Sequence, residues 1–276
     1  MAIAGAVIEP AAGASGVQPA IRLAGLTKMF GDRLAVDSMT LDIAPGELFG
    51  FLGPNGAGKT TTIKMLTGLI HPTSGRAQLC GFDVVEESLH AKRVAGYCPD
   101  QPALYDKLTG QEMLQFSGDL YGVPRDMQDA RIPPMLETFA LRNHGEELVQ
   151  SYSRGMRQKL SLCAALIHDP RVLFMDEPTV GLDPAGARQL KDVLRHLCAE
   201  GRTVFLSTHV LEVAELLCDR VGIVQHGRLM VVDTPAALRA GAGGKSLEDA
   251  FLRLTGGTVG DRPDDLGPLL SALRSS

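Results

Sequence analysis

A glycine-rich segment decides the fold, and it reads Gly53-Pro54-Asn55-Gly56-Ala57-Gly58-Lys59-Thr60. It fits the phosphate-loop pattern G-x-x-x-x-G-K-[ST] and lies between an apolar run, Leu48–Leu52, and a segment with helical spacing, Lys59–Leu69. Glycines let backbone N–H groups approach phosphate oxygens, and the helix that follows adds its positive N-terminal end. Lys59 offers a charge to the β and γ phosphates, and the Thr60 hydroxyl is a magnesium ligand. The segment therefore predicts a site for a nucleoside triphosphate and Mg²⁺, against the alternative of a plain glycine-rich turn before a helix.

The same alternation of short apolar runs and helix-patterned segments continues further along the chain. Val172–Met175 precedes the helical pattern Ala185–Leu197, and Val204–Leu206 precedes Val210–Leu217. Strands that alternate with helices in this way favour an α/β fold with a mainly parallel sheet, here a P-loop NTPase core.

Two regions depart from this alternation. Ile21–Leu26 and Val36–Ile43 flank a Gly31-Asp32 turn, which predicts an antiparallel β layer at the N-terminal side. Between about 101 and 169 only helical patterns remain, which indicates a helical subdomain inserted into the core.

Composition limits the classes of partner and compartment. The 276 residues include 27 Lys and Arg against 32 Asp and Glu, and a net charge of −5 gives no basic surface for nucleic acid. The 5 cysteines are scattered without metal-ligand or disulfide spacing, as is typical of reduced thiols in a cytosol. No apolar run approaches the 18 or so residues that a membrane span needs, and residues 1–19 lack the features of a signal peptide.

A second motif ends in adjacent carboxylates and reads Val172-Leu173-Phe174-Met175-Asp176-Glu177. Ligands of α/β sheets bind beyond the carboxyl ends of the strands, where this pair lies. Asp176 is the candidate magnesium ligand, and Glu177 is then free to polarise water for attack on the γ-phosphate. The alternative is an acidic helix N-cap.

A third segment makes the resemblance specific, and it reads Ser153-Arg154-Gly155-Met156-Arg157-Gln158. It occupies the place of the signature motif of ABC transporters, although Arg-Gly replaces the usual double glycine and Met156 the usual Gln. Over about Ile21 to Gly257 the chain resembles the ATP-binding subunit of an ABC transporter. The resemblance implies that Ser153, Gly155 and Met156 contact ATP. An ATP-binding domain is therefore expected at 20–257, with the helical insert at about 101–169. Composition indicates a flexible tail at 1–19, rich in Ala, Gly and Pro, and a weakly ordered tail at 258–276.

Other positions take roles from the same resemblance. Gly181-Leu182-Asp183-Pro184 resembles the D-loop, in which Asp183 bridges two protomers near the attacking water. Ser207-Thr208-His209 matches the switch histidine, although a lone His after a strand is more often a cap or surface residue. Phe30 stands where the family places an adenine-stacking aromatic, and Thr61 extends the phosphate loop; the alternative for Phe30 is a core position.

The clearest departure from the family lies in Tyr97-Cys98-Pro99-Asp100-Gln101. The family's Q-loop places Gln directly after this Pro, whereas Asp100 stands there and Gln101 follows. Either Asp100 binds in the magnesium shell, or the loop shifts by one residue and Gln101 reaches in. A carboxylate is a good hard ligand, so metal binding is expected in both cases.

The resemblance also implies partners and a mechanism. Two copies of the chain, or a heterodimeric pair, are expected to clamp ATP and Mg²⁺ between phosphate loop and signature helix. Separate integral-membrane permease subunits would dock around Leu104 to Leu120, which places the chain in the cytoplasm, peripheral to the inner face of the cell membrane. Residues 97–105, 152–159 and 246–252 look closest to subunits of ABC-2 type exporters, without identifying the exported substrate.

Two other classes compete with transport. One is a soluble ABC-type ATPase that acts on ribosomes or DNA, and its usual second ATPase half, long coiled-coil insertion and basic arm are not found in this sequence. The other is a P-loop kinase or GTPase, which does not explain the signature, the D-loop and His209 together.

Overall fold

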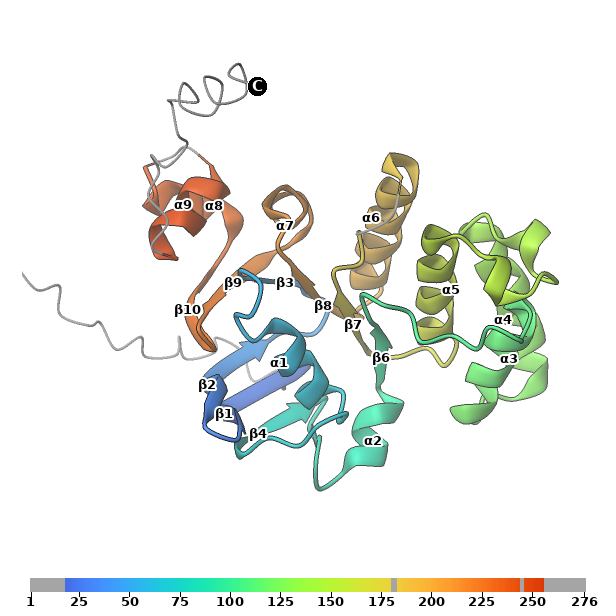
Figure 1. The fold of residues 1–276 in the computed structure, drawn as a ribbon, viewed down its shortest axis with the longest axis horizontal. Coiled ribbons are helices and arrows are strands. Elements are labelled where there is room, and N and C mark those ends of the chain that lie inside the picture. The colour runs from blue at the N-terminus through green and yellow to red at the C-terminus, as the bar shows by residue number, and fades with distance from the viewer. Residues whose placement is uncertain (1–17, 180–182, 244–245, 256–276) are drawn as a thin grey trace, which may run out of the picture.

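The main sheet is mostly parallel and carries the predicted phosphate loop. In this computed structural model, which describes residues 18–179, 183–243 and 246–255, it has 6 strands in the order β10-β9-β3-β8-β7-β6 (Figure 1). Neighbouring strands run parallel, except that β10 is antiparallel to β9. The strands are β3 (Leu48–Leu52), β6 (Ala95–Cys98), β7 (Val172–Asp176), β8 (Thr203–Thr208), β9 (Arg220–Gln225) and β10 (Arg228–Asp233).

The central strands are apolar because both of their faces are covered. Every residue of β3, β7 and β8 is buried. Successive side chains of a strand point to opposite faces, so Leu48 and Leu52 join one hydrophobic cluster while Phe49 and Phe51 join another. Near-continuous apolar runs are what a covered parallel sheet requires, and the predicted α/β class is confirmed.

A second, antiparallel sheet packs beside the first at the N-terminal side. Its order is β2-β1-β4-β5, and the β1–β2 hairpin turns at Gly31-Asp32 as predicted. α1 (Lys59–Leu66) contributes Ile63 and Leu66 to the cluster that also holds residues of both sheets. The strands are β1 (Ile21–Phe30), β2 (Arg33–Ile43), β4 (Ser74–Leu79) and β5 (Phe82–Asp83), and the short helix α2 (Ser88–Arg93) follows.

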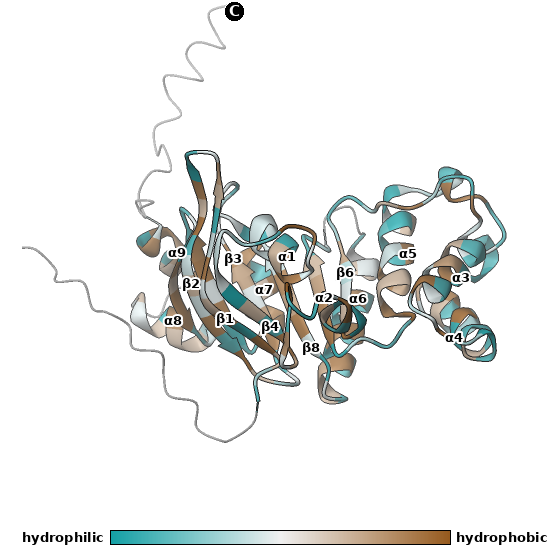
Figure 2. Cartoon of the chain, turned by 90° about the horizontal axis from the view of Figure 1, so that it is seen from below, coloured by the Kyte–Doolittle hydropathy of each residue, from teal (hydrophilic) through white to brown (hydrophobic). Residues whose placement is uncertain are grey.

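Helices occupy the chain between β6 and β7. They are α3 (Gly110–Leu120), α4 (Arg125–Thr138), α5 (Arg154–Leu166) and the 3₁₀ turns η1 (Arg142–His144) and η2 (Val149–Ser151). Figure 1 places α3 and α4 at the end of the molecule far from β1 and β2. Thr109 and Glu112 form a capping box that begins α3. Apolar faces of these helices pack inward and leave polar residues outside (Figure 2).

The C-terminal part of the described chain adds helices to the main sheet. They are α6 (Pro184–Ala199), α7 (Leu211–Leu217), α8 (Pro235–Gly241) and α9 (Leu247–Leu254). Leu238 and Leu247 place α8 and α9 in the same cluster as Leu48 of β3. The described helices include none with the length and apolarity that crossing a membrane demands. The expected tails lie almost wholly outside the described residues.

Buried thiols are a further feature of the core. All 5 cysteines are free, and Cys98, Cys163 and Cys218 are buried. Burial raises the pKa of the Cys98 thiol to about 12 and that of the half-buried Cys198 to about 11.

Gly96 permits a close approach between β6 and the end of α5. A Cβ atom at this position would lie 2.3 Å from the carbonyl oxygen of Ala165. We expect Gly96→Ala to lower the free energy of unfolding by about 1–3 kcal/mol, because strand and helix must move apart. Urea unfolding measures the change. Gly241→Ala is the control, since a Cβ at Gly241 meets nothing within 4 Å and stability should hold or rise slightly. Equal stability of the two variants would contradict the packing argument.

Candidate nucleotide-binding site

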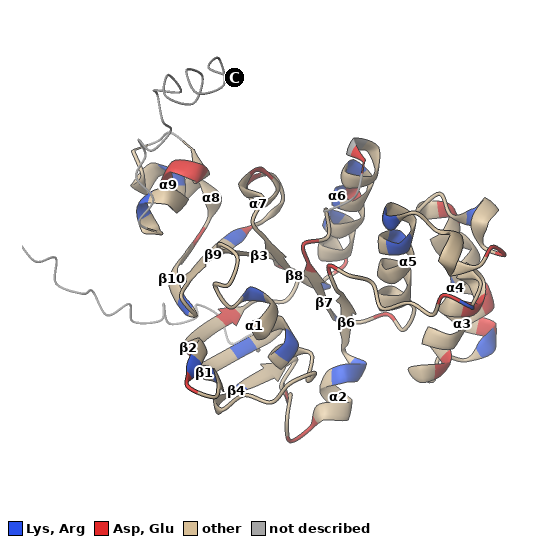
Figure 3. Cartoon of the chain, viewed as in Figure 1, with Lys and Arg blue, Asp and Glu red and all other residues tan. Residues whose placement is uncertain are grey.

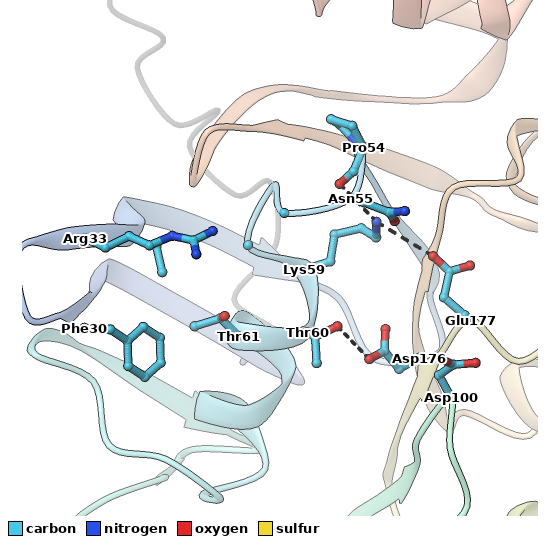
Figure 4. Close-up of a pocket in the computed structure, with 13 residues that line it drawn as sticks. Phe30, Arg33, Pro54, Asn55, Lys59, Thr60, Thr61, Asp100, Asp176 and Glu177 are labelled. Atoms are coloured by element: carbon cyan, nitrogen blue, oxygen red, sulfur yellow. Dashed lines mark hydrogen bonds and ion pairs between the residues drawn. The ribbon is translucent and has the colours of Figure 1, made fainter.

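A pocket of about 400 Å³ opens where the phosphate loop, the β1–β2 hairpin and the ends of β6 and β7 meet (Figure 4). It is lined by Phe30, Arg33, Ala35, Pro54, Asn55, Gly56, Gly58, Lys59, Thr60, Thr61, Asp100, Asp176 and Glu177. Gly53 and Ala57 are buried beneath the loop.

The backbone of the phosphate loop requires glycine at its last turn. Gly58 has a φ of 105°, and a Cβ there would lie 2.6 Å from the carbonyl oxygen of Ala35. Gly58 is also the N-cap of α1 and offers no side chain to cap it. The first N–H groups of α1 are therefore left for an anion, which the helix dipole favours.

Lys59 is buried and held against the loop and the carboxylates. Its side chain is 7% exposed, and Nζ donates to the carbonyl oxygen of Gly53 at 2.7 Å. Nζ also lies 3.7 Å from Oε1 of Glu177. Burial lowers the pKa of Lys59, while the charges of Glu177 and Asp176 oppose that shift. The ammonium group is a compact positive charge that Glu177 and Asp176 only partly offset, so it can bind phosphate oxygens.

Asp176 and Thr60 bring two hard oxygen donors together. Thr60 Oγ1 donates to Asp176 Oδ2 at 2.8 Å, and the Ser207 hydroxyl bonds Oδ1. Such oxygens suit Mg²⁺, which usually takes one or two protein ligands and completes its shell with phosphate oxygens and water. Thr60 and Asp176 therefore fit a magnesium ion that is shared with a nucleotide.

Glu177 follows β7 and contacts residues at the carboxyl end of β8. His209 Nδ1 lies 2.8 Å from Glu177 Oε1, and Thr208 Oγ1 donates to Oε2 at 3.2 Å. The backbone of Glu177 has a φ of 50°, in the left-handed region that non-glycine residues rarely adopt. These contacts aim the carboxylate across the pocket toward Lys59 (Figure 4).

The rim of the pocket carries Phe30 and a residue that the sequence analysis missed, Arg33. Phe30 is 50% exposed, and the Lys28 ammonium lies 5.1 Å from the centre of its ring. Arg33 begins β2 and is paired in register with Phe30 across the hairpin turn. This pairing could have identified Arg33 from the sequence, because the two residues that flank a two-residue turn lie side by side and Phe30 was already a candidate.

The two Q-loop candidates lie differently with respect to the pocket. Asp100 lines the pocket, whereas Gln101 is exposed and is not part of the lining. Asp100 Oδ1 lies 3.4 Å from Arg154 Nη2 at the start of α5.

The remaining candidates lie away from this pocket. Ser153 is the N-cap of α5 and accepts a hydrogen bond from the backbone N–H of Met156 at 3.3 Å. Neither these two residues nor Gly155 belongs to the lining. Asp183 is the exposed N-cap of α6, and Gly181 and Leu182 lie outside the described residues.

Comparisons with known proteins agree on one family. The family model described as ABC transporter matches residues 36–180. The daunorubicin resistance ATP-binding protein DrrA3 of Streptomyces coeruleorubidus is 41% identical over 237 residues, covering 86% of this chain and 75% of that protein. The Nod factor export ATP-binding protein I of Burkholderia lata is 42% identical over 211 residues, covering 76% and 69%. The chain is also similar to a solved ATP-binding subunit of an ABC transporter, with a TM-score of 0.80, 31% identity and coverage of 85% of this chain and 98% of that one.

Proposed function

Because the chain belongs to the ABC transporter family, as one of its ATP-binding and ATP-hydrolysing subunits, we propose that it powers export through separate integral-membrane permease subunits. The proposal rests on one observation above all, the convergence of Lys59, Thr60, Asp176 and Glu177 on a single pocket. Two relatives named for drug resistance and for Nod factor export favour an exporter. The chain would then act in the cytoplasm, at the inner face of the membrane.

The residues of the pocket divide the work on ATP. The N–H groups that begin α1 and the Lys59 ammonium bind the phosphates, and Phe30 stacks on adenine. Thr60 and Asp176 would hold magnesium with Asp100 beside them, and the ion would neutralise charge on the phosphate oxygens. Glu177 accepts the proton of the attacking water, while His209 and Thr208 fix its carboxylate and His209 contacts the γ-phosphate.

A second copy of the chain completes each site. Ser153, Gly155 and Met156 form the start of α5 but line no part of their own pocket, and Asp183 is exposed. In a symmetric pair these residues face the ATP of the other copy, where the N-terminus of α5 offers N–H groups to the γ-phosphate. ATP would then hold the pair closed, and hydrolysis would release it.

Export requires membrane partners, and gentle detergent isolation tests for them. We expect integral-membrane chains to copurify with the native protein. Tyr105 is 58% exposed and packs edge-on against Phe116 of α3, inside the region where the permease is expected to dock. Tyr105→Glu should abolish copurification and leave ATPase activity in place, because a charge in an apolar contact costs several kcal/mol.

Met230→Glu is the matched control, since Met230 is 38% exposed on β10, outside that region. It should copurify as the unaltered protein does. Cosedimentation with ribosomes and no membrane chain would overturn the export proposal in favour of a soluble ABC-type ATPase.

A further inference from the structure

One ion pair connects the nucleotide pocket to the beginning of α5. Arg154 Nη2 lies 3.4 Å from Asp100 Oδ1, across 54 positions of sequence. Asp100 is a lining residue of the pocket, and Arg154 stands between Ser153 and Gly155, the residues proposed to serve the other copy. The side chains are 59% and 39% exposed for Arg154 and Asp100, respectively. An ion pair this exposed adds at most about 1 kcal/mol to stability, so removing it should leave the protein folded.

The positions of the two side chains are fixed, because other residues in the first turns of α5 also bind the loop that follows β6. Arg157 Nη1 donates to Asp106 Oδ1 at 2.7 Å, and Gln158 Nε2 donates to the carbonyl oxygen of Pro99 at 3.4 Å. Gln158 is 4% exposed. The loop after β6 is therefore anchored on both sides of Asp100, and Arg154 meets the carboxylate from a defined direction.

Charge explains why this carboxylate needs a partner. The ionisable lining residues with positive charge are Arg33 and Lys59, against the carboxylates of Asp100, Asp176 and Glu177. Glu177 has Lys59 and His209 beside it, and Asp176 accepts hydrogen bonds from Thr60 and Ser207. Within the described residues, Arg154 is the only cation at ion-pair distance from Asp100. Without it, Asp100 would turn an uncompensated charge toward a triphosphate.

We propose that Arg154 is a positioning residue for nucleotide binding, which offsets and orients Asp100 at the rim of its own pocket. This inference rests on the proposed function of the pocket as an ATP site. Arg154 acts on the triphosphate through Asp100, so its contribution disappears once Asp100 carries no charge. The two side chains form one unit that joins the pocket to the start of α5.

A double-mutant cycle tests this unit. The variants are Arg154→Gln, Asp100→Asn and the double variant. Asp100→Asn removes the charge and keeps the side-chain shape, and Arg154→Gln removes the charge and leaves a shorter polar side chain that a helix tolerates. ATP binding is measured by calorimetry in EDTA at protein concentrations where the chain is monomeric. We expect Arg154→Gln to weaken binding by about three- to fivefold, the upper end of the range for an exposed ion pair. Asp100→Asn and the double variant should bind at least as tightly as the unaltered protein.

Salt and a control variant separate charge from shape. The loss in Arg154→Gln should shrink at about 1 M salt, where the Debye length falls to about 3 Å. Arg142→Gln is the control, because Arg142 pairs with Glu137 at 2.9 Å with side chains 67% and 65% exposed, outside the pocket lining. It should bind ATP normally, and thermal unfolding should be unchanged in all variants.

Two results would overturn the proposal. One is unaltered binding by Arg154→Gln, and the other is an equal loss in the Asp100→Asn background, which would mean that Arg154 acts independently of Asp100. Binding of Mg²⁺·ATP by the unaltered protein decides the proposed function separately. If the unaltered protein binds Mg²⁺·ATP, either of these two results excludes only the role of Arg154 and leaves the ATP site in place.

Discussion

Replacing Glu177 with Gln should lower the steady-state rate of ATP hydrolysis by about 10²- to 10⁴-fold and leave ATP binding close to normal. The amide keeps the size of the side chain and can still accept from Thr208, whose hydroxyl lies 3.2 Å away. It cannot take a proton from water. Phosphate release measures the rate, and calorimetry measures binding. Size-exclusion chromatography with ATP should show that the dimer accumulates, because hydrolysis no longer opens the ATP-bound pair.

Glu137→Gln is the control for this variant. Glu137 is an exposed carboxylate of α4, paired with Arg142 and absent from the pocket lining, so its loss should leave turnover unchanged. A normal rate in Glu177→Gln would remove Glu177 from the role of base. A slow variant that stays monomeric with ATP would instead contradict the proposed clamp.

Lys59→Met should weaken ATP binding by at least about 30-fold. The ammonium is 7% exposed, and losing a buried, hydrogen-bonded charge partner costs about 2–5 kcal/mol. Met keeps most of the apolar stem and cannot donate to phosphate oxygens. Burial lowers the pKa of Lys59, which means that the folded protein carries a desolvation cost for the charged ammonium. A neutral side chain removes this cost, so we expect the free energy of unfolding, measured in urea, not to fall.

Lys64→Met offers a matched comparison on the same helix. Lys64 lies in the last turn of α1, is exposed and is not part of the pocket lining, so the same chemical change should leave ATP binding intact. Figure 3 marks Lys and Arg in blue along the ribbons of α1, α2, α5 and α6. Equal binding by both variants would mean that the pocket does not take phosphate through Lys59.

The parts of the fold that could be predicted are those with strong local signals. β3, β7 and β8 are buried on both faces and leave continuous apolar runs, and the phosphate loop has few sequence solutions. β4 went unpredicted because its sequence, SGRAQL, is largely polar and half exposed, without strict alternation. α4 continues through Pro133 and Pro134, where local propensity would end a helix, because tertiary packing of Ile132 and Leu136 decides its course.

The residues of the site were likewise predictable only where they lie in or beside elements with strong local signals. Lys59, Thr60, Asp176 and Glu177 lie at the ends of predicted elements, so the sequence could place them near one another. Arg33 enters the pocket because the β1–β2 hairpin folds over the phosphate loop, and its only local signal was its place opposite Phe30 across the hairpin turn. Which of Asp100 and Gln101 lines the pocket depends on one residue of register in an irregular loop, and Gln158 anchors that loop at Pro99.

The buried thiols make this molecule convenient for spectroscopy. Alkylation needs the thiolate, and at neutral pH a thiol with a pKa of about 11 or 12, such as Cys198 or Cys98, is almost wholly protonated. Burial also shields Cys163 and Cys218 from reagents. A maleimide dye or spin label on a newly introduced surface cysteine would then outpace reaction at these four positions, so distances between two copies could be followed after replacing only the partly buried Cys80.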